Sequence, residues 1–151
     1  QCGSYMQNML PAWKAMVETS IHRMAYDVDA PMSLVDLQDI CEVAITVLTE
    51  DGYLDGIFEL AGPAITLRQK ADILSAVVGK SIEAQKEPLD AFLEHGKALG
   101  FSDYTLEMMS LMFPYYDKHG LVGNPRVLGW LLGREPTDFE NFARRTAAAQ
   151  S

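Results

Sequence analysis

Residues 31–52, with the sequence PMSLVDLQDICEVAITVLTEDG, decide the fold class. The first six of these residues predict a short strand that leads directly into a helix. Asp36 can accept hydrogen bonds from the free backbone N–H groups of the first turn, and Asp39 adds negative charge there. The glycine- and aspartate-rich residues 50–56 end this helix. Its apolar stripe, spaced as on one helix face, consists of Leu37, Ile40, Cys41, Ala44, Val47 and Leu48.

The segment that follows predicts two strands around a second helix. Residues 56–62, GIFELAG, have the aromatic and β-branched composition of a buried strand between glycines. Thr66 and Gln69 have the spacing of a capping box for a helix that ends at Gly79. Residues 81–88, SIEAQKEP, alternate between apolar and polar side chains and end in a proline, which predicts a second strand. Together these elements predict a β-helix-β unit.

Helices dominate the rest of the chain. Residues 4–24 predict a short helix, a break at Pro11 and an extended piece. Further helices are expected at Leu89–Leu99, Asp103–Tyr116 around Pro114, Arg126–Leu132 and after the capping pattern Thr137-Asp138-Phe139-Glu140. The expected fold is therefore α/β: one domain, 1–151, in which an α/β part at 1–88 runs into a helical subdomain at 89–151. Since two or three strands make a poor independent sheet, we expect them to complete a larger one.

Composition excludes several classes of partner. The 151 residues are 48% hydrophobic and carry a net charge of −9, which argues against a nucleic-acid or anionic-membrane surface. Cys2 and Cys41 are expected to be reduced thiols, with Cys41 a small buried side chain. No apolar run is long enough to span a bilayer, so a cytoplasmic location is expected. The chain begins with Gln1 and enters structured-looking sequence at once, so we expect a piece of a longer parent.

Motifs for catalysis or cofactor binding are missing. No glycine-rich loop follows a strand, because residues 120–123, GLVG, follow a helix. No tyrosine has a lysine four residues later. His22, His95 and His119 lack partners at metal-ligand spacing, so we expect surface or partly buried histidines and no metal site. Capping explains Asp36 better than acid/base chemistry does.

Methionines and aromatic residues form two dense groups, within residues 6–32 and 108–116. Flexible thioethers beside aromatic rings suit an adaptable pocket for a flat or apolar ligand. Core packing explains them as well, and we expect only part of the set to border a cleft.

Several short segments, in order, resemble NmrA-like proteins of the atypical short-chain dehydrogenase/reductase superfamily. Residues 5–9, YMQNM, resemble the family's aromatic-x-x-Asn segment, and residues 33–40, SLVDLQDI, resemble its V-D-x-x-D-I helix start. Residues 56–66, GIFELAGPAIT, resemble its strand-Gly-Pro-Thr passage, and residues 79–80 the Gly-Lys that ends the next helix. Residues 134–142, REPTDFENF, resemble its C-terminal R-x-P-T-x-F helix. The similarity covers essentially the whole chain.

The resemblance implies that this is the C-terminal part of a Rossmann-type fold, on the substrate side. A missing N-terminal half would bind NADP or NAD. It also implies that Tyr5, Met6 and Asn8 border the substrate cleft, and Trp13 is added from its proximity. Asn8 could bond a substrate carbonyl or tie down its own turn.

Three functions remain open at this point. The first is an NAD(P)H-dependent reductase of a small apolar carbonyl, enone or quinone. The second is a redox-inactive dinucleotide sensor that binds a protein. The third is a stand-alone binder or isomerase that uses no cofactor. If the chain exists alone, we expect its sheet edge to pair with a second copy.

Overall fold

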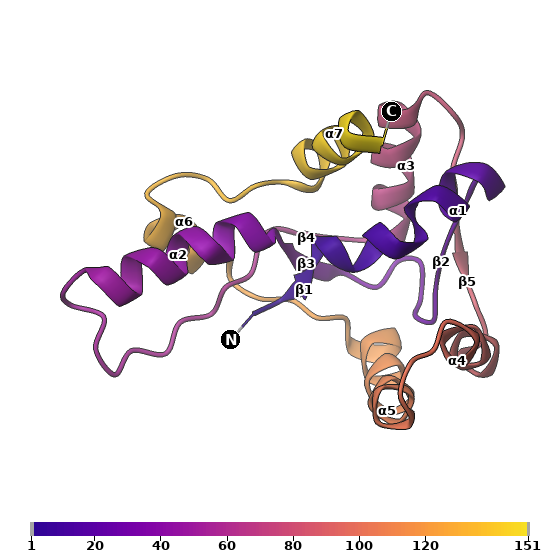
Figure 1. Ribbon diagram of the computed structural model, residues 1–151, viewed down its shortest axis with the longest axis horizontal. Helices are drawn as coiled ribbons and strands as arrows, with labels where there is room; N and C mark the ends of the chain where they lie inside the picture. The colour runs from indigo at the N-terminus through magenta and orange to yellow at the C-terminus, as the bar shows by residue number, and fades with distance from the viewer. Residues whose placement is uncertain (1, 151) are drawn as a thin grey trace.

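A computed structural model describes residues 2–150, and Figure 1 shows an α/β arrangement with short strands at the centre. The strands are β1 Ser4–Tyr5, β2 Ile21–Met24, β3 Met32–Val35, β4 Ala64–Ile65 and β5 Glu83–Lys86. The helices are the 3₁₀ helix η1 Met6–Ala12, α1 Trp13–Thr19, α2 Leu37–Thr49, α3 Leu67–Val78, α4 Leu89–Ala98, α5 Asp103–His119, α6 Pro125–Leu132 and α7 Phe139–Gln150. The α/β fold class is confirmed.

Two small sheets divide these strands. β3 lies at the centre of the first sheet, where β1 pairs with it in parallel and β4 pairs antiparallel. β2 and β5 form the second sheet as a parallel pair over their full lengths. The predicted strand at residues 81–88 is confirmed as β5, and the extended piece before residue 24 as β2. The predicted β-helix-β unit, however, does not close on itself, because β5 pairs with β2 rather than with the strand that precedes α3.

The predicted buried strand at residues 56–62 is wrong. Ile57 is 85% exposed, and only Leu60 makes an isolated parallel bridge, to Cys2. Pairing with β3 begins later, at Ala64. Gly62 accounts for this arrangement: its N–H donates to the Leu34 carbonyl at 2.9 Å, and an added Cβ would lie 2.2 Å from that oxygen. The backbone at Gly62 therefore lies close beside β3, although the strand itself begins only at Ala64.

The predicted helix ends are largely confirmed. The Asp36 side chain caps α2, and Thr66 and Gln69 form a complete capping box on α3. α3 ends at Gly79, whose φ of 68° is the left-handed conformation that glycine favours. Pro11 and Pro114 lie inside helices rather than ending them. At α7 the cap differs from the prediction, because Asp138 accepts from the Asn141 N–H while Thr137 bonds elsewhere.

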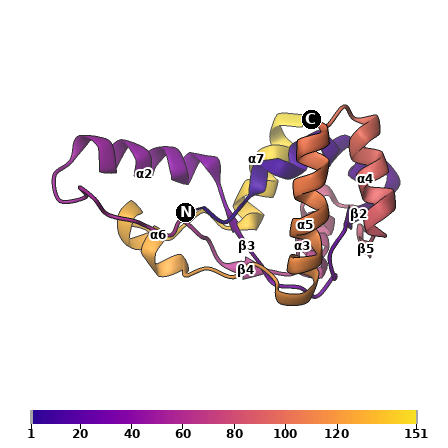
Figure 2. The same ribbon diagram turned by 90° about the horizontal axis from the view of Figure 1, so that it is seen from below.

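The core lies on both sides of α3. α7 and β5 pack against α3, and α4 packs against α5 (Figures 1 and 2). A second, smaller cluster joins α2 to α6, and Figure 1 shows this pair extending away from the rest of the chain. Among residues 2–150 no helix is long and apolar enough to cross a membrane.

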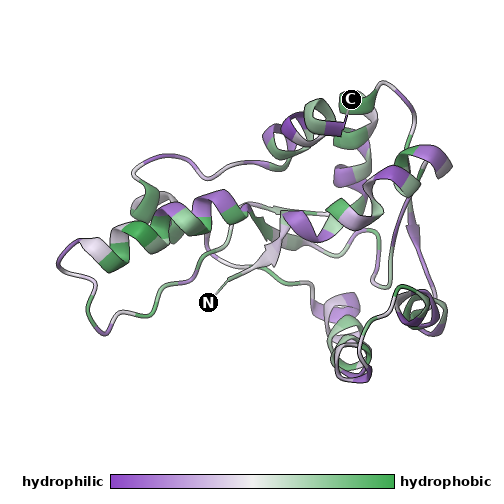
Figure 3. Ribbon diagram, in the orientation of Figure 1, coloured by the Kyte–Doolittle hydropathy of each residue, from purple (hydrophilic) through white to green (hydrophobic). Residues whose placement is uncertain are grey.

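Cys41 is exposed, which corrects the expectation that it is buried. α2 turns Asp39 and Val43 inward, so the opposite face of the helix points to solvent. Most of α2 is coloured as hydrophobic in Figure 3, and Leu48 on the outward face is 82% exposed. We call this face the α2 stripe; it consists of Leu37, Cys41, Ile45 and Leu48.

Candidate functional site

The four predicted cleft residues, three from the resemblance and Trp13 from its proximity to them, lie on β1, η1 and the start of α1, in two layers. Tyr5 is 38% exposed and Asn8 is exposed, whereas Met6 and Trp13 are buried in the main core. Their segment follows directly from the parallel pairing of Tyr5 with Val35. The carboxyl end of a parallel strand is where α/β proteins commonly bind ligands. The polar pair is therefore available to a ligand, and the apolar pair supports the backbone beneath it.

Tyr5 is suited to donating a hydrogen bond. Negative charge on the Cys2 side chain would disfavour a second negative charge on Tyr5 and so raises the pKa of Tyr5; a side-chain hydrogen bond with Cys2 and slight burial act in the same direction. The hydroxyl therefore keeps its proton at neutral pH.

Met6 lines a small hollow of about 180 Å³ together with Leu34, Pro63, Ile65, Ile73, Asp138, Phe139 and Glu140. This volume is below that of most small-molecule sites, which begin near ~300 Å³.

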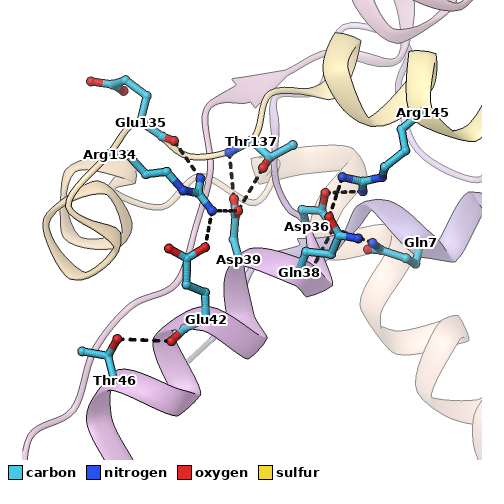
Figure 4. A network of polar contacts seen from close by, with 10 residues as sticks. All are labelled: Gln7, Asp36, Gln38, Asp39, Glu42, Thr46, Arg134, Glu135, Thr137 and Arg145. Atoms are coloured by element: carbon cyan, nitrogen blue, oxygen red, sulfur yellow. Dashed lines mark hydrogen bonds and ion pairs between the residues drawn. The ribbon is translucent and has the colours of Figure 1, made fainter. Parts of the chain in front are cut away.

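Gln7 is a residue of this segment that sequence reasoning passed over. Its side-chain amide donates to Asp36 Oδ1 at 2.6 Å (Figure 4). The amide oxygen also accepts from the Leu37 N–H at 3.1 Å. The second carboxylate oxygen of Asp36 accepts from Arg145 of α7 at 2.5 Å. Burial alone would raise the pKa of Asp36, but hydrogen bonds from Gln38 N–H, Arg145 and Gln7 outweigh it and lower that pKa.

Asp39 anchors the segment that enters α7. It accepts from Arg134 at 2.8 Å and from both the N–H and the hydroxyl of Thr137, at 2.7 and 2.9 Å. Arg134 also bonds Glu42 one turn further along α2 (Figure 4). Both Asp36 and Asp39 are 0% exposed, so each buried carboxylate is matched by an arginine. The capping prediction for Asp36 is confirmed, and these long-range partners are additional to it.

A second buried polar group lies between β2 and α3. Lys70 Nζ donates to the Tyr26 hydroxyl at 3.0 Å and is only 6% exposed. Burial lowers the pKa of Lys70 to about 8 and raises that of Tyr26. His22 on β2 is also buried, and desolvation together with the nearby Lys70 charge lowers its pKa to about 3. No hollow described in the structure reaches this group, so we treat it as part of the core.

α5 carries the exposed part of the methionine and aromatic set. Phe113 packs inward against Tyr26 and Phe92. The outward face, which we call the α5 face, consists of Tyr104, Met108, Leu111, Met112 and Tyr115. Their spacing of three and four residues places them on one side of the helix. Part of the set is therefore core and part is free to meet a ligand or a neighbouring domain.

The larger hollow, of about 370 Å³, lies where β2 and β5 end. Its lining is Ala25, Lys86, Glu87, Pro88, Leu89, Pro114 and Asp117. Lys86 and Asp117 form an ion pair of 2.6 Å within this lining. None of the four predicted site residues borders it.

Gly120 and Gly123, the two glycines of the GLVG segment, lie against other parts of the chain. An added Cβ at Gly120 would lie 2.5 Å from the Pro31 carbonyl, and one at Gly123 would lie 2.5 Å from the Ala61 side chain. Space for a pyrophosphate beside these backbones is thus already filled, and the GLVG segment does not fit a dinucleotide. The described residues also contain no group of three His, Cys, Asp or Glu side chains that could hold a metal ion.

Comparisons with known proteins place this geometry in a wider context. No family model matches the chain. It is 26% identical over 150 residues to the NAD(P)H azoreductase of Xenophilus azovorans, covering 99% of this chain and 52% of that protein. The NADPH-dependent quinone oxidoreductase of Escherichia coli superposes with a TM-score of 0.82 at 26% identity, over 95% of this chain and 52% of that one. NmrA, a negative transcriptional regulator solved with NAD, superposes with a TM-score of 0.71 at 14% identity over 99% of this chain and 53% of that one.

The resemblance to NmrA-like proteins is thereby confirmed. The chain shares the α/β fold of the matching half of these Rossmann-type proteins and spans about half of their length. At 14% identity the likeness to NmrA itself concerns the fold alone. The comparisons do not test the roles of Tyr5, Met6, Asn8 and Trp13, which stay predictions.

Proposed function

We propose that this chain is the substrate-side half of an NAD(P)H-dependent reductase that acts on a small apolar carbonyl, enone or quinone. The observation that carries this proposal is the 26% identity, over 95% or more of the chain, to an azoreductase and to a quinone oxidoreductase. Both relatives are named as NAD(P)H-dependent reductases. A cytoplasmic location, where reduced nicotinamide is present, is part of the proposal.

The described residues divide the work in a simple way. Tyr5 and Asn8, both exposed, donate hydrogen bonds to the substrate's carbonyl oxygen. The α5 face supplies an adaptable apolar wall, because thioethers and aromatic rings repack around flat ligands. When bound, the reduced nicotinamide supplies the hydride. Since the chain's own atoms occupy the space beside Gly120 and Gly123, we place the pyrophosphate site on the remaining half of a longer protein.

The partner of this chain follows from its unpaired surfaces. Among the described residues β1 pairs only with β3, and the α2 stripe is exposed. We propose that the remaining part of a Rossmann sheet covers both, since the relatives are about twice as long as this chain. Sedimentation of the 151-residue chain tests this. A second copy that covers the same surfaces would appear as a dimer, and Ile45→Glu would then return the chain to a monomer.

The test of the proposed activity compares variants of the complete gene product. We expect 1,4-naphthoquinone to be reduced with consumption of NADPH, followed by its absorbance. Asn8→Ala should lower kcat/KM by roughly a hundredfold, the scale at which one donor to a developing oxyanion acts. Asn141→Ala is the matched control, because Asn141 is an exposed asparagine on α7.

Other outcomes would identify the other functions. Saturable NADPH binding with no turnover of any quinone or enone would contradict the reductase and favour a dinucleotide sensor. Absence of NADPH binding, together with binding of naphthoquinone by the 151-residue chain, would favour a binder that uses no cofactor. Equal loss of activity in Asn8→Ala and Asn141→Ala would remove Asn8 from the site.

A further inference from the structure

Polar contacts join residues 5–9, which we call the site segment, to α7 near the other end of the chain, and the proposed function does not use these contacts. Asp36 is fully buried, yet it receives hydrogen bonds from Gln7, the Gln38 N–H and Arg145. Gln7 lies between Tyr5 and Asn8 in sequence, and Arg145 lies on α7. A buried carboxylate is tolerated only when its partners are in place, so this contact has one favoured geometry.

We propose that Asp36, held by Arg145, positions Gln7 and thereby fixes the orientation of Tyr5 and Asn8 toward the substrate. The role in substrate binding rests on the function proposed above, whereas the fixed geometry of Tyr5 and Asn8 rests on the contacts alone. Asp36 and Arg145 are positioning residues here, because they act through Gln7.

The local backbone shows why Gln7 can do this. It sits in η1, a 3₁₀ helix, whose hydrogen bonds are weaker than those of an α-helix. The N-cap of η1, Tyr5, makes no side-chain capping bond. The two bonds of the Gln7 amide, to the Asp36 carboxylate and the Leu37 N–H, therefore tie η1 to the start of α2. Arg145 completes the arrangement by bonding both Asp36 and the Gln38 side chain, at 2.5 and 2.7 Å.

The chain offers a closely matched control. Arg134 pairs with Asp39, the other buried carboxylate at the start of α2, and is 42% exposed in its side chain, as is Arg145. Arg134 bonds Asp39, Glu42 and the Glu135 carbonyl. None of these residues belongs to η1. Removing Arg134 thus takes away a similar ion pair on the same helix without touching the Gln7 contact.

Structure is measured first, on the 151-residue chain. In two-dimensional NMR spectra we expect Gln7→Ala and Arg145→Met to shift or broaden the backbone amides of residues 5–9 and the Asn8 side-chain amide. Arg134→Met should leave these signals in place and move those of residues 135–139. Arg145→Lys should partly restore the signals of residues 5–9, because a lysine can reach Asp36 but cannot also bond Gln38 in the same plane.

Activity is measured second, on the complete gene product with NADPH and naphthoquinone. We expect Gln7→Ala and Arg145→Met to lower kcat about ten- to hundredfold while the KM for NADPH changes little, since misplacement by about 1 Å has effects on this scale. Arg134→Met should retain kcat at equal thermal stability. Unchanged amide signals for residues 5–9 in both variants would overturn the positioning role.

Shifted signals with unchanged kcat would overturn the link to substrate. If the unaltered gene product reduces nothing, the proposed function fails and so does that link. The spectra still show, independently of any activity, whether Gln7 and Arg145 fix the geometry of residues 5–9. The two failures are therefore distinguishable.

Discussion

Lys70→Met should stabilise the fold at neutral pH, although it removes a hydrogen bond. Lys70 is 6% exposed, and its ammonium group donates a hydrogen bond to the Tyr26 hydroxyl at 3.0 Å. Burial lowers its pKa to about 8 from an ordinary 10.5. One pKa unit corresponds to about 1.4 kcal/mol, so keeping this amine charged costs the folded state roughly 3 kcal/mol below pH 8.

The sign of the pH dependence follows from the same difference. Between pH 8 and 10.5 the unfolded chain holds the lysine proton and the folded chain has released it. Stability therefore rises with pH through this window, as the penalty on the charged folded form disappears. In Lys70→Met this contribution should be absent, and the free energy of unfolding should be flatter there than in the unaltered chain.

The Tyr26 hydroxyl decides how much of the gain is seen. Left buried without a partner, it costs about 1–3 kcal/mol, which offsets much of the benefit. The double variant Lys70→Met with Tyr26→Phe removes both polar groups, and we expect it to be about 2–3 kcal/mol more stable than the unaltered chain at pH 7.

Urea unfolding followed by tryptophan fluorescence, at pH 7 and at pH 10, measures these differences. Lys14→Met is the control, because its side chain is 86% exposed, and it should leave both values unchanged. A double variant less stable than the unaltered chain at pH 7, or one with the same rise above pH 8, would refute the reasoning.

Three further predictions concern single positions. The pKa of His22 is about 3 in the folded chain and 6.5 in the unfolded chain, so between these pH values only the unfolded chain binds a proton at His22. The free energy of unfolding should therefore fall by roughly 5 kcal/mol as the pH drops from 6.5 towards 3. His22→Leu should reduce this loss in acid-unfolding curves. Gly62→Ala should destabilise the chain by about 2–4 kcal/mol in urea unfolding, since the new Cβ would lie 2.2 Å from the Leu34 carbonyl oxygen, whereas Gly129→Ala, whose new Cβ would lie 3.4 Å from its nearest neighbour, should cost less. Thr66→Ala should cost about 1 kcal/mol by loss of the capping box, and Thr66→Ser should restore most of it in thermal unfolding.

Local patterns in the sequence predicted the helices well, because capping and periodicity depend on neighbours within a few residues. The capping box at Thr66 and the helix end at Gly79 are examples. The strand predicted at residues 56–62 was wrong because strand pairing depends on segments that are distant in the sequence. A short apolar run between glycines is compatible with a strand, but pairing also requires a free strand edge next to it. Ala64 and Ile65, which follow this run, occupy that edge of β3.

The buried polar groups needed information that spacing does not contain. Arg134 and Arg145 lie 95 and 109 residues from the aspartates that they pair with, so capping alone looked like a sufficient explanation. Lys70 did leave a signal. It lies three residues after Leu67 and four before Leu74, on the buried face of the same helix, and a charge there already indicated a paired or desolvated amine.

The Asp36 carboxylate thus bonds both η1 and α7, through Gln7 and Arg145. Removing Arg145 and neutralising Asp36 should therefore have unequal effects. Loss of Arg145 leaves Asp36 buried and charged with only neutral donors, whereas loss of the Asp36 charge leaves an arginine that is 42% exposed in its side chain and can be solvated. Removing one partner of a buried pair is costly mainly through the charge that stays behind. Substitution on α7, more than 100 residues from η1, should therefore disturb the site more than neutralising the carboxylate beside it.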